Sequence, residues 1–187
     1  MIFREVEDSD LIAKARRKDV EAYNLLVSRW ERRIYNYLLR LVKDREDALD
    51  LSQDVFLKAY QNLGKLEDAS RFAPWLFRIA HNEAYSLLRK NRPETDLEAR
   101  IEGVDWGEVS PGRNMMPIEV SLAIESAMSR LSADQREAVV LKIYQGFKFE
   151  EMAEILECPV STVKSRLYTA LDLLKDTLAP VQMRGVE

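Results

Sequence analysis

The chain has 187 residues, of which 47% are hydrophobic and 32% are charged, and its net charge at pH 7 is −4. A single cysteine, Cys158, excludes an internal disulfide, and a single histidine, His81, leaves too few soft ligands for a zinc site. No apolar run approaches the roughly 18 residues that span a bilayer, and the acidic N-terminus lacks the regions of a signal peptide. We therefore expect a cytoplasmic protein without metal, cofactor or membrane insertion.

The charges are unevenly distributed along the chain. Residues 1–92 carry 18 basic and 15 acidic side chains, residues 93–117 carry two and six, and residues 118–187 carry eight and eleven. A weakly basic front and an acidic back predict a protein that cannot hold nucleic acid by charge alone. If the chain binds DNA, a larger partner must supply part of the affinity.

The first ninety residues have the apolar spacing of helices. One amphipathic series continues to Lys43 and is made of Leu11, Ala15, Ala22, Leu25, Leu26, Trp30, Ile34, Tyr37, Leu38 and Leu41. A second helix is predicted over 44–63, with Gly64 taking a positive φ to end it. After a polar loop at 65–71, a third pattern predicts a helix over 72–90, with Pro74 tolerated in its first turn. No segment alternates like a strand, so this half is predicted to be a bundle of about four helices.

Residues 91–117 interrupt the helical pattern. The segment holds three of the six prolines and three of the six glycines, and it is acidic. This composition predicts a flexible linker between two small helical domains.

The C-terminal part predicts a helix-turn-helix. A helix is expected over 118–130, and Ser132 and Gln135 form a capping box for the next one, which ends at Gly146. Two short helices then follow, separated by Cys158 and Pro159. A tight joint between two short helices is typical of a helix-turn-helix, and we place the DNA-binding segment within 142–178.

The second of these helices has two distinct faces. At 100° per residue, one stripe is predicted to be buried and consists of Val163, Leu167, Ala170, Leu171 and Leu174. The opposite face carries Ser161, Lys164, Ser165 and Tyr168, which suit base edges and thymine methyl groups in a major groove. Arg166 is better placed for a phosphate. An ordinary amphipathic helix in a bundle is the alternative interpretation.

Several segments resemble bacterial extracytoplasmic-function (ECF) RNA polymerase sigma factors of the RpoE-like type. Pro159–Ala170, Leu131–Arg136 and Phe149–Leu156 resemble their region 4, Asp47–Tyr60 resembles region 2.2, and Phe72–Asn82 resembles region 2.3. The resemblance covers residues 8–178 in the family's order. It implies an all-α fold with region 2 at 1–92, a linker at 93–117 and region 4 at 118–187. The implied function is to bind core RNA polymerase, direct it to specific promoters and help to open the −10 region.

The resemblance also implies three contact surfaces. The surface for the clamp helices of the largest polymerase subunit would comprise Asp50, Gln53, Asp54, Phe56 and Lys58. The −10 surface would comprise Ser70, Phe72, Trp75, Arg78, Asn82, Arg89 and Lys90. The −35 surface would comprise Lys164, Ser165 and Tyr168, with Pro159, Ser161, Thr162 and Arg166 as secondary contacts. Region 4 would also meet the flap of the second-largest subunit, and an anti-sigma factor acting in a stress response is implied.

Some alternatives stay open at this stage. Trp75 and Phe77 fit a hydrophobic core as well as a DNA-facing surface, and the carboxylates of residues 47–54 fit a solvated face. Ser161 and Thr169 replace a usual Gly and Arg, which leaves the promoter sequence open. A stand-alone helix-turn-helix regulator would explain residues 131–178 but would leave 8–92 without a role. An enzyme is not supported, because the sequence has neither a phosphate-binding glycine loop nor an acid–histidine cluster.

Overall fold

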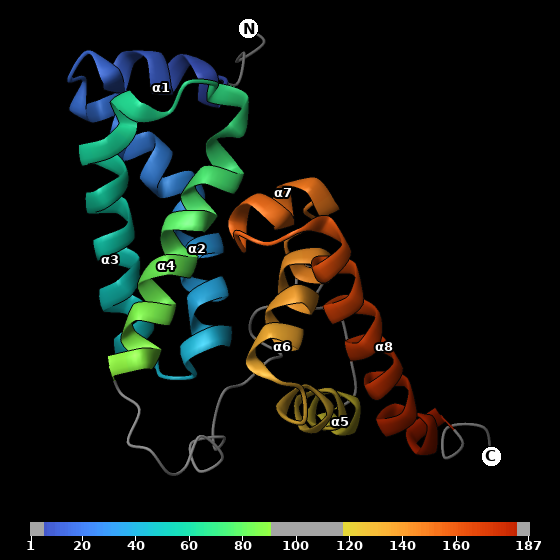
Figure 1. The fold of residues 1–187 in the computed structure, drawn as a ribbon. Helices are drawn as coiled ribbons and strands as arrows, with labels where there is room; N and C mark the ends of the chain where they lie inside the picture. The colour runs from blue at the N-terminus through green and yellow to red at the C-terminus, as the bar shows by residue number, and fades with distance from the viewer. Residues whose placement is uncertain (1–5, 91–117, 183–187) are drawn as a thin grey trace, which may run out of the picture.

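The computed structural model describes residues 6–90 and 118–182, and within them the fold is two helical domains without a strand (Figure 1). The N-terminal domain consists of α1 (Asp8–Arg16), α2 (Val20–Val42), α3 (Arg45–Asn62) and α4 (Phe72–Lys90). The C-terminal domain consists of α5 (Ile118–Ser129), α6 (Ala133–Val139), α7 (Phe149–Ile155) and α8 (Val160–Gln182). The all-α prediction and the four-helix bundle are confirmed. The predicted linker lies outside the described residues.

The first amphipathic series is two helices and not one. Lys18 takes a positive φ of 71°, and the Asp19 carboxylate then caps α2 by accepting a hydrogen bond from the Ala22 N–H at 3.0 Å. This turn lets α1 fold across the end of the bundle, where Leu11, Ile12 and Ala15 are buried. Leu25, which the sequence places in the amphipathic series, is exposed on α2.

Helix ends in this domain are set by polar side chains and backbone conformation. Asp44 caps α3 by accepting from the N–H groups of Glu46 and Asp47, at 2.9 and 3.0 Å. Gly64 does not take a positive φ as predicted. Instead, α3 continues into a 3₁₀ turn at Leu63–Lys65, and the Arg16 guanidinium donates to the carbonyl groups of Leu63 and Leu66. The Arg16 side chain of α1 therefore donates the hydrogen bonds that the carbonyl groups at the end of α3 require. The sequence had predicted that a turn at Gly64 would end the helix instead.

Lys43 ends α2 in the left-handed conformation, with φ at 59°. Burial, reinforced by the charge of Arg136, lowers the pKa of Lys43 from 10.5 to about 8. We expect Lys43→Gly to raise the free energy of unfolding at pH 7 by about 0.5–1 kcal/mol, because glycine adopts this φ without a Cβ clash. The wild-type protein should gain stability relative to the variant between pH 8 and 10.5, as the folded chain releases the Lys43 proton first.

Urea unfolding at several pH values measures this effect. The same change at Lys14, an exposed position inside α1, is the matched control and should lower stability, because glycine disfavours a helix interior. A Lys43→Gly protein that is less stable than wild type would contradict the strain argument.

The C-terminal domain follows the predicted caps but differs in helix length. Ser132 Oγ accepts from the Gln135 N–H at 3.2 Å, and Gln135 Oε1 accepts from the Ser132 N–H at 3.0 Å, which confirms the capping box. The chain continues from α6 through a π turn at Val140–Tyr144 and reverses at Gly146, where φ is 76°. The second helix of the predicted helix-turn-helix is not short. α8 runs for 23 residues and packs along α5, α6 and α7.

The two domains touch directly. Helices α4 and α2 of the first domain face α7 and α6 of the second (Figure 1). The rings of Phe77 on α4 and Phe147 before α7 meet edge to face, with centroids 4.9 Å apart. No local pattern of residues indicated this contact, which joins α4 of the first domain to the segment before α7 of the second.

Candidate nucleic-acid interface

The joint between α7 and α8 is built by local hydrogen bonds. Glu157 takes a positive φ of 50°, and the Cys158 N–H donates back to the Ala153 carbonyl at 3.1 Å. The Pro159 carbonyl then accepts from the N–H groups of Thr162 and Val163 and starts α8. Met152 and Ile155 of α7 are buried with Val163 of α8 beneath this turn. The predicted helix-turn-helix is therefore present.

The exposed face of α8 is the face that the helical period predicted. Lys164, Ser165 and Tyr168 are exposed, and 55% of the Tyr168 surface is accessible. Pro159 and Ser161 are also exposed, and Thr162 is half-buried. On the opposite face Val163, Leu167 and Ala170 are buried, but the prediction that Leu171 is buried was wrong.

An aromatic residue that the sequence reasoning missed supports this face. Phe149, at the start of α7, lies with its ring 6.4 Å from that of Tyr168, and the ammonium of Lys164 is 5.3 Å from the Phe149 ring. The ammonium of Lys142 is 4.7 Å from the same ring. Such cation–π contacts restrict flexible lysine side chains at an exposed site. Phe149 is thus expected to orient the surface of α8.

Arg166 connects helices of the C-terminal domain. Its Nη2 atom lies 2.7 Å from Asp134 Oδ2, and its Nη1 atom lies 3.9 Å from Cys158 Sγ. These contacts tie α8 to α6 and to the turn. In this structure the Arg166 guanidinium therefore contacts other side chains of the protein. The sequence had predicted that it contacts a DNA phosphate.

A surface groove lies where the 63–71 segment meets α4. It has a volume of about 290 Å³, near the lower end of the roughly 300–1,000 Å³ typical of small-molecule sites. We call it the α4 groove, and it is lined by Lys65, Leu66, Glu67, Asp68, Arg71, Pro74, Trp75, Arg78 and Glu154. Two arginines, one lysine and one indole ring therefore line this hollow together with three carboxylates, and Arg71 and Arg78 form ion pairs with Glu154 and Glu157.

The sequence left open whether Trp75 lies in the hydrophobic core or on the surface, and the structure gives it a part in both. It is half-buried, with its ring centroid 5.9 Å from that of Phe72, and it also lines the α4 groove. Phe72 itself is only 3% exposed and packs against Trp30, so its predicted place among the DNA contacts is corrected to a core position. Phe77 is fully buried.

The remaining predicted residues of this surface lie along α4 and the preceding turn. Ser70, Arg78, Asn82, Arg89 and Lys90 are all exposed. The Asp68 carboxylate accepts from the Ser70 N–H at 2.9 Å, and hydrogen bonding with Ser70 lowers the pKa of Asp68. Arg71 also lines the groove and was not among the predicted contacts, although its neighbour Ser70 was.

The outer face of α3 carries most of the predicted polymerase contacts. Asp50, Gln53 and Asp54 are exposed, and Lys58 pairs with Glu83 of α4 at 2.5 Å. Phe56 is buried, so its assignment to the contact surface is corrected. Two exposed leucines, Leu49 and Leu57, flank the acidic residues and were not predicted. Their spacing of four residues from Gln53 on either side was the available signal.

The described residues hold no group of three or more His, Cys, Asp or Glu side chains that could bind a metal ion. Burial raises the pKa of the Cys158 thiol, which is not the environment of a reactive cysteine. None of the helices in the described ranges is long and apolar enough to cross a membrane.

Comparison with known proteins decides the family. Residues 26–94 match the family described as Sigma-70 region 2, and residues 121–174 match Sigma-70, region 4. The RNA polymerase sigma-H factor of Pseudomonas aeruginosa is 32% identical over 184 residues, covering 94% of this chain and 95% of that protein. The ECF RNA polymerase sigma-E factor of Escherichia coli K12 is 31% identical over 189 residues, covering 96% and 98%.

The chain belongs to the ECF sigma factors. Its function is therefore to direct RNA polymerase to promoters. The match of residues 26–94 to region 2 excludes the stand-alone regulator, which had no role for that half of the chain.

Two solved structures share the fold of this ECF sigma factor. CnrH in complex with the cytosolic domain of CnrY aligns with a TM-score of 0.68 at 25% identity, covering 92% of this chain and 97% of that one. The Bartonella quintana sigma factor RpoE in complex with the anti-sigma factor NepR aligns with a TM-score of 0.65 at 31% identity, covering 87% and 98%. Both alignments extend over the two domains.

Proposed function

We propose that this ECF sigma factor reads its promoter with two surfaces on separate domains. The exposed face of α8 reads the −35 element as duplex DNA. The α4 groove and the exposed side of α4 hold the melted non-template strand of the −10 element. The observation that carries the proposal is the exposed cation, hydroxyl and phenol of Lys164, Ser165 and Tyr168 on the second helix of the helix-turn-helix.

The chemistry of α8 fits the major groove. A lysine ammonium donates to guanine O6 and N7, a serine hydroxyl donates or accepts, and an aromatic ring contacts a thymine methyl. Pro159, Ser161 and Thr162 stand at the N-terminal end of the same helix, where backbone N–H groups favour phosphates. Arg166 reaches a phosphate only if it leaves Asp134.

The chemistry of the α4 groove fits an unpaired base. A base that leaves the stack needs a hollow, an aromatic surface and cations along its backbone. Trp75 supplies the ring, Arg71 and Arg78 supply charge at the groove, and Arg89 and Lys90 extend the charge to the end of α4. Phe72 contributes by packing behind Trp75.

The proposed function also implies the partners of this protein and the compartment in which it acts. Polymerase supplies the affinity that a chain of net charge −4 lacks. The proposed sites hold no catalytic group, and the protein acts beside polymerase in the cytoplasm. The anti-sigma factor bound to RpoE in its solved structure supports an anti-sigma factor for this chain as well. We propose that the acidic segment 93–117 spans the polymerase between the two domains, and that region 4 meets the flap.

The outer face of α3 is proposed to dock on the clamp helices of the largest subunit. We expect Asp50→Lys with Asp54→Lys to lower the affinity for core polymerase at least roughly tenfold, because it places like charges against a basic partner. Fluorescence titration of labelled sigma factor with core enzyme measures the effect. The control is the same charge change on α2, Glu21→Lys with Glu31→Lys, both exposed. Equal losses in the two double variants would contradict a specific surface.

Run-off transcription with core polymerase on a genomic promoter library tests the whole proposal. The expected result is a defined set of transcripts whose promoters share a −35 and a −10 element. If the promoters of these transcripts share only one of the two elements, the proposed role of the domain that reads the other element is contradicted. No promoter-specific transcript with any core enzyme would overturn the proposal.

A further inference from the structure

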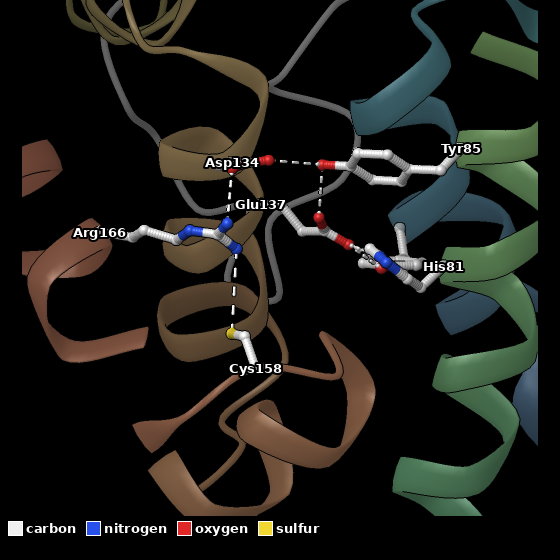
Figure 2. A network of polar contacts seen from close by, with 7 residues as sticks. His81, Tyr85, Asp134, Glu137, Cys158 and Arg166 are labelled. Atoms are coloured by element: carbon white, nitrogen blue, oxygen red, sulfur yellow. Dashed lines mark hydrogen bonds and ion pairs between the residues drawn. The ribbon is translucent and has the colours of Figure 1, made fainter. Parts of the chain in front are cut away.

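Arg166 of α8 is held by side chains of its own domain (Figure 2). Its Nη2 atom lies 2.7 Å from Asp134 Oδ2, and its Nη1 atom lies 3.9 Å from the Sγ atom of Cys158. Asp134 lies in the first turn of α6, and Cys158 lies in the turn between α7 and α8. One guanidinium therefore connects the DNA-reading helix to two other elements of the C-terminal domain.

Arg166 lies at the edge of the DNA-reading face of α8. Its side chain is 29% exposed, whereas its neighbour Ser165 is fully on the exposed face. At 100° per residue, Thr162 and Thr169 share this edge with Arg166. A helix that lies in a major groove brings its edges toward the DNA backbones, so a cation at this position can bind a phosphate. Asp134 pairs with the guanidinium that such a phosphate would otherwise bind.

The helix has few other cations for the DNA backbone. α8 carries three, which are Lys164, Arg166 and Lys175. Lys175 lies about three turns beyond Lys164, so only Lys164 and Arg166 are near the N-terminal end that would enter the groove. Residues 118–187 hold eight basic and eleven acidic side chains. The ion pair with Asp134 therefore removes a large part of the charge with which this domain can bind phosphates.

A carboxylate and a phosphate compete for a guanidinium on similar terms. Both accept parallel hydrogen bonds from its planar donors, and both oppose its positive charge. Asp134 belongs to the same folded domain, which gives it a high effective concentration at Arg166. The Cys158 thiol is not an anionic competitor, because burial raises its pKa and keeps it protonated. The second carboxylate oxygen of Asp134, Oδ1, accepts from the Tyr85 hydroxyl at 3.3 Å, so Oδ2 stays with Arg166.

The place of Asp134 also has a purely structural explanation. An acid in the first turn of a helix is favoured by the N–H groups and the dipole there, and Asp134 comes just after the Ser132 cap of α6. This explanation does not require the carboxylate to contact α8. The two explanations differ in DNA binding, because stabilising α6 does not change the number of phosphates that α8 contacts.

We propose that Asp134 is a positioning residue that holds Arg166 away from the DNA backbone, so that α8 binds the −35 duplex with one phosphate contact fewer. This inference rests on the proposed role of α8 in reading the −35 element. The consequence is a lower affinity for every duplex with an unchanged preference for the right bases, because a phosphate contact carries no sequence information. Promoters with a weak −35 element then stay unbound at concentrations at which a released Arg166 would bind them.

Holoenzyme assembled from core polymerase and the full-length chain tests the proposal. The variants are Asp134→Asn, Arg166→Gln, the two combined, and the control Asp176→Asn, which removes an exposed acid near the other end of α8. Fluorescence anisotropy reports equilibrium binding to a labelled promoter duplex, below the temperature at which the promoter opens. A second duplex has a scrambled −35 element. Salt is varied from about 50 to 200 mM, because the slope of log affinity against log salt counts phosphate contacts.

The expected results follow from the release of one cation. Asp134→Asn should raise the affinity for both duplexes by the same factor, up to roughly fivefold, the most that a partly exposed ion pair usually contributes. The salt slope should steepen by about 0.9, the value of one additional phosphate contact. Neither change should occur in Asp176→Asn, or when Asp134→Asn is added to Arg166→Gln. Thermal unfolding checks each variant, and Asp134→Ser repeats the test if Asp134→Asn lowers stability.

Other outcomes overturn the inference. If Asp134→Asn changes neither affinity nor slope, or weakens binding to the native promoter alone, Asp134 does not hold Arg166 away from phosphate. If its effect persists in the Arg166→Gln background or equals that of Asp176→Asn, the effect comes from general charge. If Arg166→Gln alone flattens the slope by about 0.9, Arg166 already binds a phosphate in the wild type.

Failure of the proposed function gives a different result. A wild-type holoenzyme that binds the native and scrambled duplexes equally does not read the −35 element through α8. The salt slopes of Asp134→Asn and wild type would still report whether Arg166 gains a phosphate, because that contact does not depend on the bases.

Discussion

Replacing Lys164, Ser165 and Tyr168 together with alanine is expected to reduce transcription from promoters that depend on a −35 element by on the order of a hundredfold or more. All three side chains are exposed on the same face of α8. A well-made contact to a base edge contributes roughly 1–3 kcal/mol of discrimination, and roughly 1.4 kcal/mol corresponds to a factor of ten. Run-off transcription with saturating core enzyme measures the loss, and thermal unfolding checks that the fold is unchanged.

The control lies further along the same helix. Lys175 is an exposed cation of α8, about three turns beyond Lys164 and so away from the N-terminal end that would enter the groove. Lys175→Ala removes a charge of the same kind and should leave transcription within about twofold of wild type. If the triple variant and Lys175→Ala lose activity to the same degree, α8 contributes only unspecific charge and the −35 assignment is refuted.

Phe77→Ala is expected to lower the free energy of unfolding by about 3–5 kcal/mol, the usual cost of deleting a buried aromatic side chain. Phe77 is fully buried on α4, with the Tyr37 ring centroid 5.0 Å away and the Phe147 ring 4.9 Å away. Truncation removes contacts both within the N-terminal domain and across the domain interface. Urea unfolding followed by circular dichroism measures the loss.

Leu25→Ala is the matched control for Phe77→Ala. Leu25 belongs to the apolar series that the helical spacing picks out, yet it is exposed on α2. Its truncation should therefore change stability by no more than about 0.5 kcal/mol. A loss at Leu25 as large as that at Phe77 would mean that the N-terminal bundle packs with a different face of α2 inward.

The amino-acid sequence by itself determined the helical class of the fold and the exposed face of α8. These features depend on local rules: the 100° period separates Val163 and Leu167 from Ser165 and Tyr168, and side-chain caps such as Ser132 act within one turn. The bounds of α4 and the start of α3 followed for the same reason. The resemblance of residues 47–60 and 72–82 to region 2 then gave the family, because it depends on residue identity and order alone.

The tertiary structure alone decided which apolar side chains are covered and what the charged ones face. Periodicity placed Leu25 in an amphipathic series and Leu171 in a buried stripe, but no helix packs closely enough on those positions to bury them. Periodicity did not decide whether Trp75 is a core residue or a surface residue. In the structure its ring packs against Phe72 and also lines the α4 groove. The partners of Arg71, Arg78 and Glu137 come from the other domain, separated by more than fifty residues in sequence. Contacts between residues so far apart in the sequence depend on how the two folded domains pack together. No local pattern of residues encodes that packing.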